Sequence, residues 1–257
     1  MNLDGLITLF QHMPAMMLVM TRIGALFVTA PVIGGVMVPG TVKALLTIAV
    51  ALILMPRASP TDIPLDLSFI LLLTREMLLG LSLGWLLSLY FTGVQMGGEL
   101  INRHAGFNSV ENFDPESNIG AGPMGDLLHL GMVLLFFASD GHHLLLASLA
   151  RSYELMPLGA WAPSPALGSL VAQGMADSWT IALALSFPVL SAVMAITLTE
   201  GVMTRAIPQI NVLHMSFAVK IIVSVGVLYA GMPAVVAFLG TVLVAMHGMA
   251  GGFLVLH

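Results

Sequence analysis

Long uninterrupted apolar stretches restrict the folds open to this chain more than any other feature. A helix needs about 20 apolar residues to cross the hydrocarbon layer of a membrane, and several stretches approach or exceed that length. No stretch alternates polar and apolar residues with a period of two, so the sequence does not support a β-barrel. We therefore predict an all-α, multi-helix, membrane-associated protein. The six or seven predicted helices are at about 13–33, 42–55, 67–96, 127–150, 179–199, 212–229 and 233–256.

The composition indicates a protein surrounded by lipid or by other protein. Of the 257 residues, 58% are hydrophobic and 8% are charged, and the mean hydropathy is +1.00. An ordinary soluble domain has roughly 25% charged residues. The net charge of −5 is spread along the chain, so no basic patch indicates nucleic-acid binding. Cysteine is absent, which excludes disulfides and thiolate metal sites.

Gly120, Gly122 and Gly125 match the G-x-G-x-x-G spacing of a dinucleotide-binding turn. That turn requires a buried β-strand before its first glycine and a helix N-terminus that receives the pyrophosphate. Residues 111–118 instead read ENFDPESN, a polar stretch whose three acidic residues would repel an anion. We therefore predict a turn, followed by a helix that starts near Pro123 and Asp126.

Gly80, Ser82 and Gly84 spell the G-x-S-x-G motif of α/β-hydrolases. That motif requires a strained turn between a strand and a helix, whereas here it lies inside a long apolar run that favours a helix. Glycines four residues apart are typical of close helix packing in membranes. The same spacing recurs at Gly93/Gly97 and at Gly248/Gly252. The sequence therefore predicts close helix contacts instead of serine catalysis.

A group of acidic and histidine residues falls on or near one predicted helix. Metal sites in helical bundles use Glu-x-x-His pairs from facing helices, and the remaining histidines lack carboxylates at matching offsets. We interpret the group as polar residues that hydrogen-bond across a helix interface, and we predict no metal. Its members are Asp126, His129, Asp140, His142 and His143.

Charged residues inside the apolar runs are the most informative polar positions. Arg22, Lys43, Arg75, Glu76 and Lys220 lie within or at the start of such runs. A charge that faces lipid at the centre of a bilayer costs more than about 2.5 kcal/mol. We therefore expect these side chains to face protein or water, with snorkelling to an interface as an alternative for Lys43.

The basic residues between the predicted helices give no membrane orientation. Arg57, Arg103, Arg151 and Arg205 are spread almost one to a loop, so the positive-inside rule favours neither side.

The sequence favours a subunit immersed in a larger assembly, because it combines charges inside the apolar runs, glycine spacings typical of close helix packing, and no signal for membrane orientation. The alternatives are a small-molecule channel or transporter, for which no paired inverted repeat is found, and an intramembrane enzyme, which rests only on the motifs rejected above.

Several short motifs follow one another in a specific order along nearly the whole chain. They are Arg22 with Pro31, Gly34, Val38-Pro39 and Lys43; Arg75-Glu76 with Gly80 and Gly84; Val94 to Glu99 with Gly106 and Asp114-Pro115; Asp140-Gly141-His142 with Ser152 and Met156 to Gly159; and Thr204 to Asn211 with Phe217 to Ile221. Each motif is weak by itself, but the ordered set is specific. In this order the chain resembles the FliR/SctT family of the bacterial type III export apparatus.

The resemblance implies a protein without a catalytic role or cofactor, in the bacterial inner membrane at the flagellar basal body. It implies a single domain over residues 1–257, similar to a FliP-like part at about 1–177 joined to a FliQ-like hairpin at about 178–257. One copy is expected to join FliP and FliQ in an export gate for unfolded flagellar proteins, with FlhB and FlhA beside and below it. A virulence SctT homologue is the alternative within the family.

The resemblance also implies a plug, a segment after the third long helix that projects into the pore and helps to close it. Here the plug would run from about Gly106 to Gly120, with glycines that supply bending and a proline that interrupts the helical path. A passive surface loop is the alternative. The expected plug residues are Gly106, Phe107, Asn108, Val110, Phe113, Asp114, Pro115 and Gly120.

Eight charged or polar residues are expected to make buried polar contacts or contacts within the assembly. Five are the charges inside apolar runs, and three come from the motifs of the resemblance. The full set is Arg22, Lys43, Arg75, Glu76, Glu99, Arg205, Gln209 and Lys220.

Overall fold

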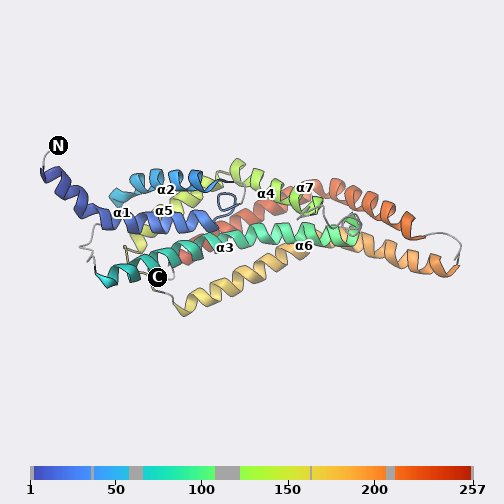
Figure 1. Cartoon of the computed structure of the whole chain (residues 1–257). Helices are drawn as coiled ribbons and strands as arrows, with labels where there is room; N and C mark the ends of the chain where they lie inside the picture. Colours follow the sequence, from blue (N-terminus) through green and yellow to red (C-terminus); the bar gives the residue numbers. More distant parts are fainter. Residues whose placement is uncertain are drawn as a thin grey trace. The chain divides into compact units, whose positions relative to one another are not determined.

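The computed structural model describes residues 3–35, 38–57, 66–107, 122–162, 164–206 and 212–255, with the backbone alone at 3–12 and 212–215. Within these ranges the secondary structure is helical and no β-strand occurs, which confirms the all-α prediction. The elements are α1 (Leu3–Thr29), α2 (Gly40–Leu54), the 3-10 helix η1 (Met55–Arg57), α3 (Leu67–Ala105), α4 (Pro123–Ala138), α5 (Gly141–Leu155), α6 (Pro165–Ala206) and α7 (Val212–Val255) (Figure 1).

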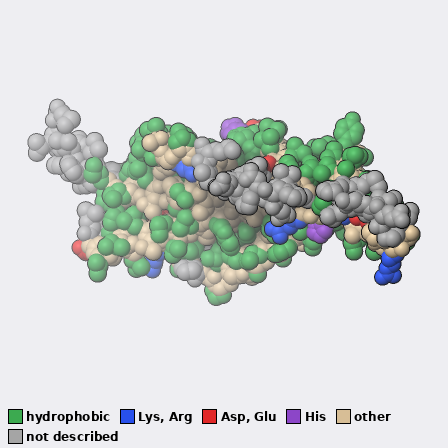
Figure 2. All heavy atoms as spheres, turned by 45° about the vertical axis from the view of Figure 1, so that its right-hand side comes forward, with side chains coloured by type: hydrophobic (Ala, Val, Ile, Leu, Met, Phe, Trp, Pro, Cys, Tyr) green, Lys and Arg blue, Asp and Glu red, His purple; other side chains and the backbone are tan. Residues whose placement is uncertain are grey.

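Four of these helices are long and apolar enough to cross a membrane, and α4 with α5 would form a fifth, broken span. The four spans are Gly40–Arg57, Leu67–Ala105, Pro165–Ala206 and Ser216–Val255. Large apolar side chains also lie on the surface, where Leu45 is 68%, Phe187 71% and Tyr229 82% exposed. Figure 2 shows hydrophobic side chains over much of the visible surface. The chain is therefore an all-α membrane protein.

α1 begins before the predicted residue 13, and α3 and α6 extend beyond the predicted 67–96 and 179–199. The division of the chain into helices also differs from the prediction at two places. Asp140 interrupts the apolar run at 127–150, because its left-handed backbone, with a φ of 56°, cannot continue an α-helix. The last two predicted helices form the single helix α7, which passes through Pro233 without ending. Helices in membranes tolerate an internal proline because neighbouring groups can satisfy the carbonyl that the proline leaves unbonded.

The chain folds into two compact units, and α3, α6 and α7 each contribute residues to both. The first unit consists of Met1–Leu89, Asp140–Gly174 and Ala245–His257, and the second of Tyr90–Ser139 and Met175–Val244. Within the first unit α1 and α2 lie side by side (Figure 1). Its buried core includes Leu18, Ile23 and Leu26 of α1 with Leu79, Leu83 and Leu86 of α3. The predicted division near residue 177 into FliP-like and FliQ-like parts stays a prediction.

Two of the three glycine pairs lie at close helix contacts. In the first unit, a Cβ on Gly80 or Gly84 would lie within 3.0 Å of α1 backbone or side-chain atoms. In the second unit, a Cβ on Gly93 would lie 2.7 Å from Ser178 of α6, and a Cβ on Gly97 would lie 3.1 Å from Ala182 and from Leu185. The third predicted contact is absent among the described residues, because a Cβ on Gly248 or Gly252 would have no neighbour within 4 Å. Ser82 lies inside α3, as the helical interpretation of its motif predicts.

Candidate functional site

Arg22 on α1 and Glu76 on α3 form an ion pair that is fully buried in the first unit. Arg22 Nε donates to Glu76 Oε2 at 2.5 Å, and Nη2 donates to Oε1 at 3.0 Å. Two parallel bonds of this kind fix the orientation of both side chains as well as their distance. A pair this deep needs further hydrogen bonds to offset the loss of water around both charges.

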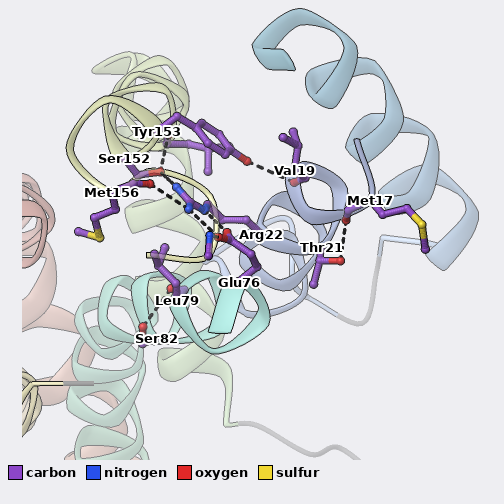
Figure 3. A network of polar contacts seen from close by, with 12 residues as sticks. Met17, Val19, Thr21, Arg22, Glu76, Leu79, Ser82, Ser152, Tyr153 and Met156 are labelled. Atoms are coloured by element: carbon purple, nitrogen blue, oxygen red, sulfur yellow. Dashed lines mark hydrogen bonds and ion pairs between the residues drawn. The ribbon is translucent and has the colours of Figure 1, made fainter. Parts of the chain in front are cut away.

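Groups from α5 and from the turn after it supply those hydrogen bonds to Arg22 (Figure 3). Nη1 donates to Ser152 Oγ at 3.2 Å, and Nη2 donates to the Met156 carbonyl at 3.1 Å. The guanidinium carbon lies 4.3 Å from the centre of the Tyr153 ring, within range of a cation–π interaction. The Tyr153 hydroxyl in turn donates to the Val19 carbonyl of α1 at 3.2 Å. One arginine thus connects α1, α3 and α5.

The turn that follows α5 is held by two consecutive residues of α3. The Gly159 N–H donates to Glu76 Oε1 at 2.7 Å, and Arg75 Nη1 donates to the Gly159 carbonyl at 3.0 Å. Gly159 has a φ of 74°, which glycine adopts without steric cost, and a Cβ there would collide with Leu72. Arg75 and Glu76 therefore satisfy both backbone groups of a residue whose conformation favours glycine.

Lys43 closes the turn between α1 and α2 within the same unit. Its Nζ donates to the Gly34 and Gly35 carbonyls at 2.9 Å and 3.2 Å. The turn contains Val32 with a φ of 70°, which is rare for a β-branched residue and requires support from its surroundings. Lys43 provides such support, since it bonds two successive carbonyls of this turn.

In the second unit, α3 holds the start of α4 at the base of the predicted plug. α4 begins at Pro123, as predicted, and its N-cap Gly122 has no side chain to cap the helix. Glu99 Oε1 accepts the Gly122 N–H at 2.8 Å, and Asn102 Oδ1 accepts the Met124 N–H at 3.0 Å. Two side chains of another helix therefore satisfy amide groups that lack partners at a helix start.

The chain consequently leaves α3 and returns to it near the same end. Gly106, directly after α3, has a φ of 84°, and Gly122 is bonded to Glu99. A Cβ on Gly98 would lie within 3.0 Å of the Gly125 backbone, so α3 and α4 touch closely. Gly106 and Phe107 are half-buried. The other expected plug residues, Asn108, Val110, Phe113, Asp114, Pro115 and Gly120, lie outside the described residues.

Asn102→Ala should loosen the first turn of α4 by about 1 kcal/mol, the usual cost of losing a helix cap. The amide of Met124 should then exchange with deuterium about fivefold faster, which mass spectrometry of a peptide over residues 122–130 can measure. Arg103→Ala, an exposed neighbour on α3, is the control and should leave this exchange unchanged. An unchanged rate in Asn102→Ala would show that Asn102 does not hold α4.

Lys220 on α7 and Glu200 on α6 form an ion pair in the second unit. Their Nζ and Oε2 atoms lie 3.0 Å apart, and the side chains are 16% and 18% exposed. A cavity of about 340 Å³ lies beside the pair, lined mainly by Ala195, Ile196, Thr199, Met203, Ser216 and Val219. Glu200 is the one acidic residue after Asp177 in the sequence.

Two expected contact residues remain. Arg205 is exposed in the last turn of α6, and Gln209 lies outside the described residues. Ser152, Met156 and Gly159 belong to one of the motifs of the resemblance, but the sequence did not identify them as partners of the buried pair. Asn102 and Glu200 carried no motif signal that pointed to their contacts.

The fold and these contacts define a multi-helix membrane protein in which a buried ion pair, a partly exposed ion pair and side-chain caps hold the helices together. Residues 13–246 match the family model described as bacterial export proteins, family 1. Because this match covers most of the chain, the protein belongs to that family.

Relatives from several bacteria carry the name flagellar biosynthetic protein FliR. The protein of Bacillus subtilis (strain 168) is 28% identical over 226 residues, which are 86% of this chain and 86% of the relative. The protein of Caulobacter vibrioides is 26% identical over 214 residues, 82% of this chain and 85% of the relative. That of Escherichia coli (strain K12) is 25% identical over 225 residues, 84% of each. The predicted membership of the FliR/SctT family is confirmed.

Proposed function

We propose that this protein is a subunit of the flagellar type III protein export gate, in the bacterial inner membrane at the flagellar basal body. The observation that carries the proposal is the match to a bacterial export family over residues 13–246, together with relatives named flagellar biosynthetic proteins. The buried polar groups around Arg22 and Glu76 support a structural role, because they bond to one another and to backbone groups. We assign the protein no catalytic activity.

FliP and FliQ are the proposed partners that cover much of its apolar surface. FlhB and FlhA would act beside and below the gate, and unfolded flagellar proteins would pass through it. The support is the number of large apolar side chains that α2, α6 and α7 expose, since such surfaces require lipid or another protein. They include Leu45, Ile53, Phe187, Leu198, Ile222 and Tyr229. The paired helices α6 and α7 are consistent with a FliQ-like hairpin at about 178–257.

Residues 106–120 are the proposed plug of this gate. The support comes from the base of the segment, where Glu99 and Asn102 hold Gly122 and Met124 against α3. With both ends fixed, a segment of this length could extend about 20 Å from its base and return. A fixed base is what a plug needs in order to open without detaching.

The plug proposal predicts a leak when the segment loses its apolar bulk. Replacing residues 107–120 by a Gly/Ser linker of equal length should let small dyes and ions cross the inner membrane several-fold faster, while the protein still accumulates. Dye uptake by cells that carry only the variant measures this. The control is a Gly/Ser replacement of residues 58–65, which should not leak. Equal uptake by both variants would show that residues 107–120 are a passive loop.

Deletion of the whole gene tests the function itself. Cells without the protein should not swim and should not export flagellar proteins, and a plasmid copy should restore both. Cells that swim normally but lose secretion through a virulence apparatus would identify an SctT homologue. Cells with intact flagella and altered uptake of a small solute would favour the channel or transporter and contradict the proposal.

A further inference from the structure

Three potential metal ligands converge at the start of α5, in the first unit. One carboxylate oxygen of Asp140 and one ring nitrogen each of His142 and His143 all lie within 4.8 Å of one another. His143 Nδ1 is 3.3 Å from Asp140 Oδ1, and the two imidazole centres are 4.2 Å apart. The side chains of Asp140 and His143 are 75% and 70% exposed. Such exposure does not fit the packing role that the sequence suggested for these two residues.

The backbone determines this convergence. Asp140 has a φ of 56° and a ψ of 27°, a left-handed conformation in which the residue directly precedes α5. Its carbonyl accepts the amide hydrogens of His143 and Leu144 at 2.9 Å and 3.2 Å, so the first turn of α5 is formed on Asp140. Residues three apart lie on one helix face, and this places the Asp140 carboxylate beside the His143 ring.

We propose that Asp140, His142 and His143 bind a divalent transition-metal ion of the Zn²⁺, Ni²⁺ and Co²⁺ class. Two imidazoles and a carboxylate are donors that these ions prefer, whereas Ca²⁺ and Mg²⁺ select sets of oxygen ligands. Three protein ligands leave the remaining coordination positions to water. This site is separate from the buried network around Arg22, and it does not depend on the proposed export function.

The distances allow such an ion with small side-chain movements. Metal–ligand bonds of about 2.0–2.1 Å in a tetrahedral site place ligand atoms about 3.4 Å from one another. The ligand atoms here lie at most 4.8 Å apart, so the longest distance between two of them has to shorten by at most about 1.4 Å. Rotation of the exposed Asp140 and His143 side chains can supply this change. The bound ion would fasten the first turn of α5 to the residue that precedes it.

Metal titration of the full-length chain tests the site. The protein is purified in detergent without a histidine tag, stripped with a chelator, and titrated calorimetrically with Zn²⁺ and, separately, by absorbance with Co²⁺. We expect one ion of each kind per chain, with Co²⁺ giving visible bands typical of mixed nitrogen and oxygen ligands. The thermal unfolding midpoint should rise as Zn²⁺ is added, because the ion binds only the folded site.

Variants separate this site from other histidines. His142→Ala with His143→Ala should weaken Zn²⁺ binding at least tenfold, while His104→Ala, which removes an exposed histidine of α3, should not change it. Asp140→Asn keeps a residue that tolerates the left-handed backbone, so it should stay folded and still weaken binding. The proposal is overturned if the double variant binds Zn²⁺ as the parent protein does, or if the parent protein binds no ion at a defined stoichiometry.

Discussion

Arg22→Met and Glu76→Gln should each destabilise the first unit by about 3–5 kcal/mol, because each leaves the opposite charge buried without its partner. Both side chains have no exposed surface, so water cannot replace the missing partner. The double variant Arg22→Met with Glu76→Gln should recover much of this loss, since it buries no net charge. Thermal unfolding in detergent, followed by tryptophan fluorescence, gives the three midpoints.

Arg151→Met is the matched control for this prediction, because Arg151 is an exposed arginine on α5. Exposed substitutions usually change the free energy of unfolding by less than about 0.5 kcal/mol. Two results would contradict the account of the buried pair. One is a single variant whose unfolding midpoint equals that of the parent protein. The other is a double variant whose loss in the free energy of unfolding equals the sum of the two single losses.

Gly80→Val should separate α1 from α3 and cost about 1–3 kcal/mol or more, as overpacking of a tight contact does. A Cβ on Gly80 would lie within 3.0 Å of the Arg22 carbonyl and the Ala25 side chain. The Arg22 carbonyl belongs to the helix backbone, so it cannot turn aside as the end of a flexible side chain could. Gly80 is one helical turn beyond Glu76, so the same displacement should strain the ion pair. Combining Gly80→Val with Arg22→Met should therefore cost less than the sum of the two.

Gly226→Val distinguishes a steric effect from a change in helix propensity. Gly226 lies within α7 and would meet nothing within 4 Å, so its substitution has no helix contact to disturb. The unfolding midpoint of Gly226→Val should stay close to that of the parent protein. If both glycine variants lower the midpoint equally, the loss at Gly80 does not come from the contact with α1.

Hydropathy and local start signals were enough to predict the helical fold. The apolar runs predicted where α2 and α3 begin, and Pro123 marked the start of α4. Averaged hydropathy missed the break at Asp140, because one residue in the left-handed conformation hardly changes the average, although the dipeptide Asp140-Gly141 is typical of turns. Pro233 wrongly suggested a helix end. Whether a proline ends a long membrane helix depends on the neighbouring groups that the tertiary structure provides, and the sequence does not show these.

The contacts of the buried charges follow from the sequence only in part. The cost of an isolated charge indicates that Arg22 needs a partner, but Glu76 is 54 residues away and Ser152 is 130 residues away. Choosing among the acids required the fold to bring α1, α3 and α5 together. The cap of α4 by Asn102 is equally non-local, because a side chain of α3 accepts the hydrogen bond from a first-turn amide that the side chain of the N-cap residue usually accepts.

The central claim is that this protein is a subunit of an export gate, and native mass spectrometry tests this claim most directly. The protein is expressed alone and then together with FliP and FliQ from the same bacterium, and purified in detergent. The account predicts a complex that contains one copy of this chain and several copies of each partner. A stable monomer or homo-oligomer that associates with neither partner would contradict the account and favour an independent channel or transporter.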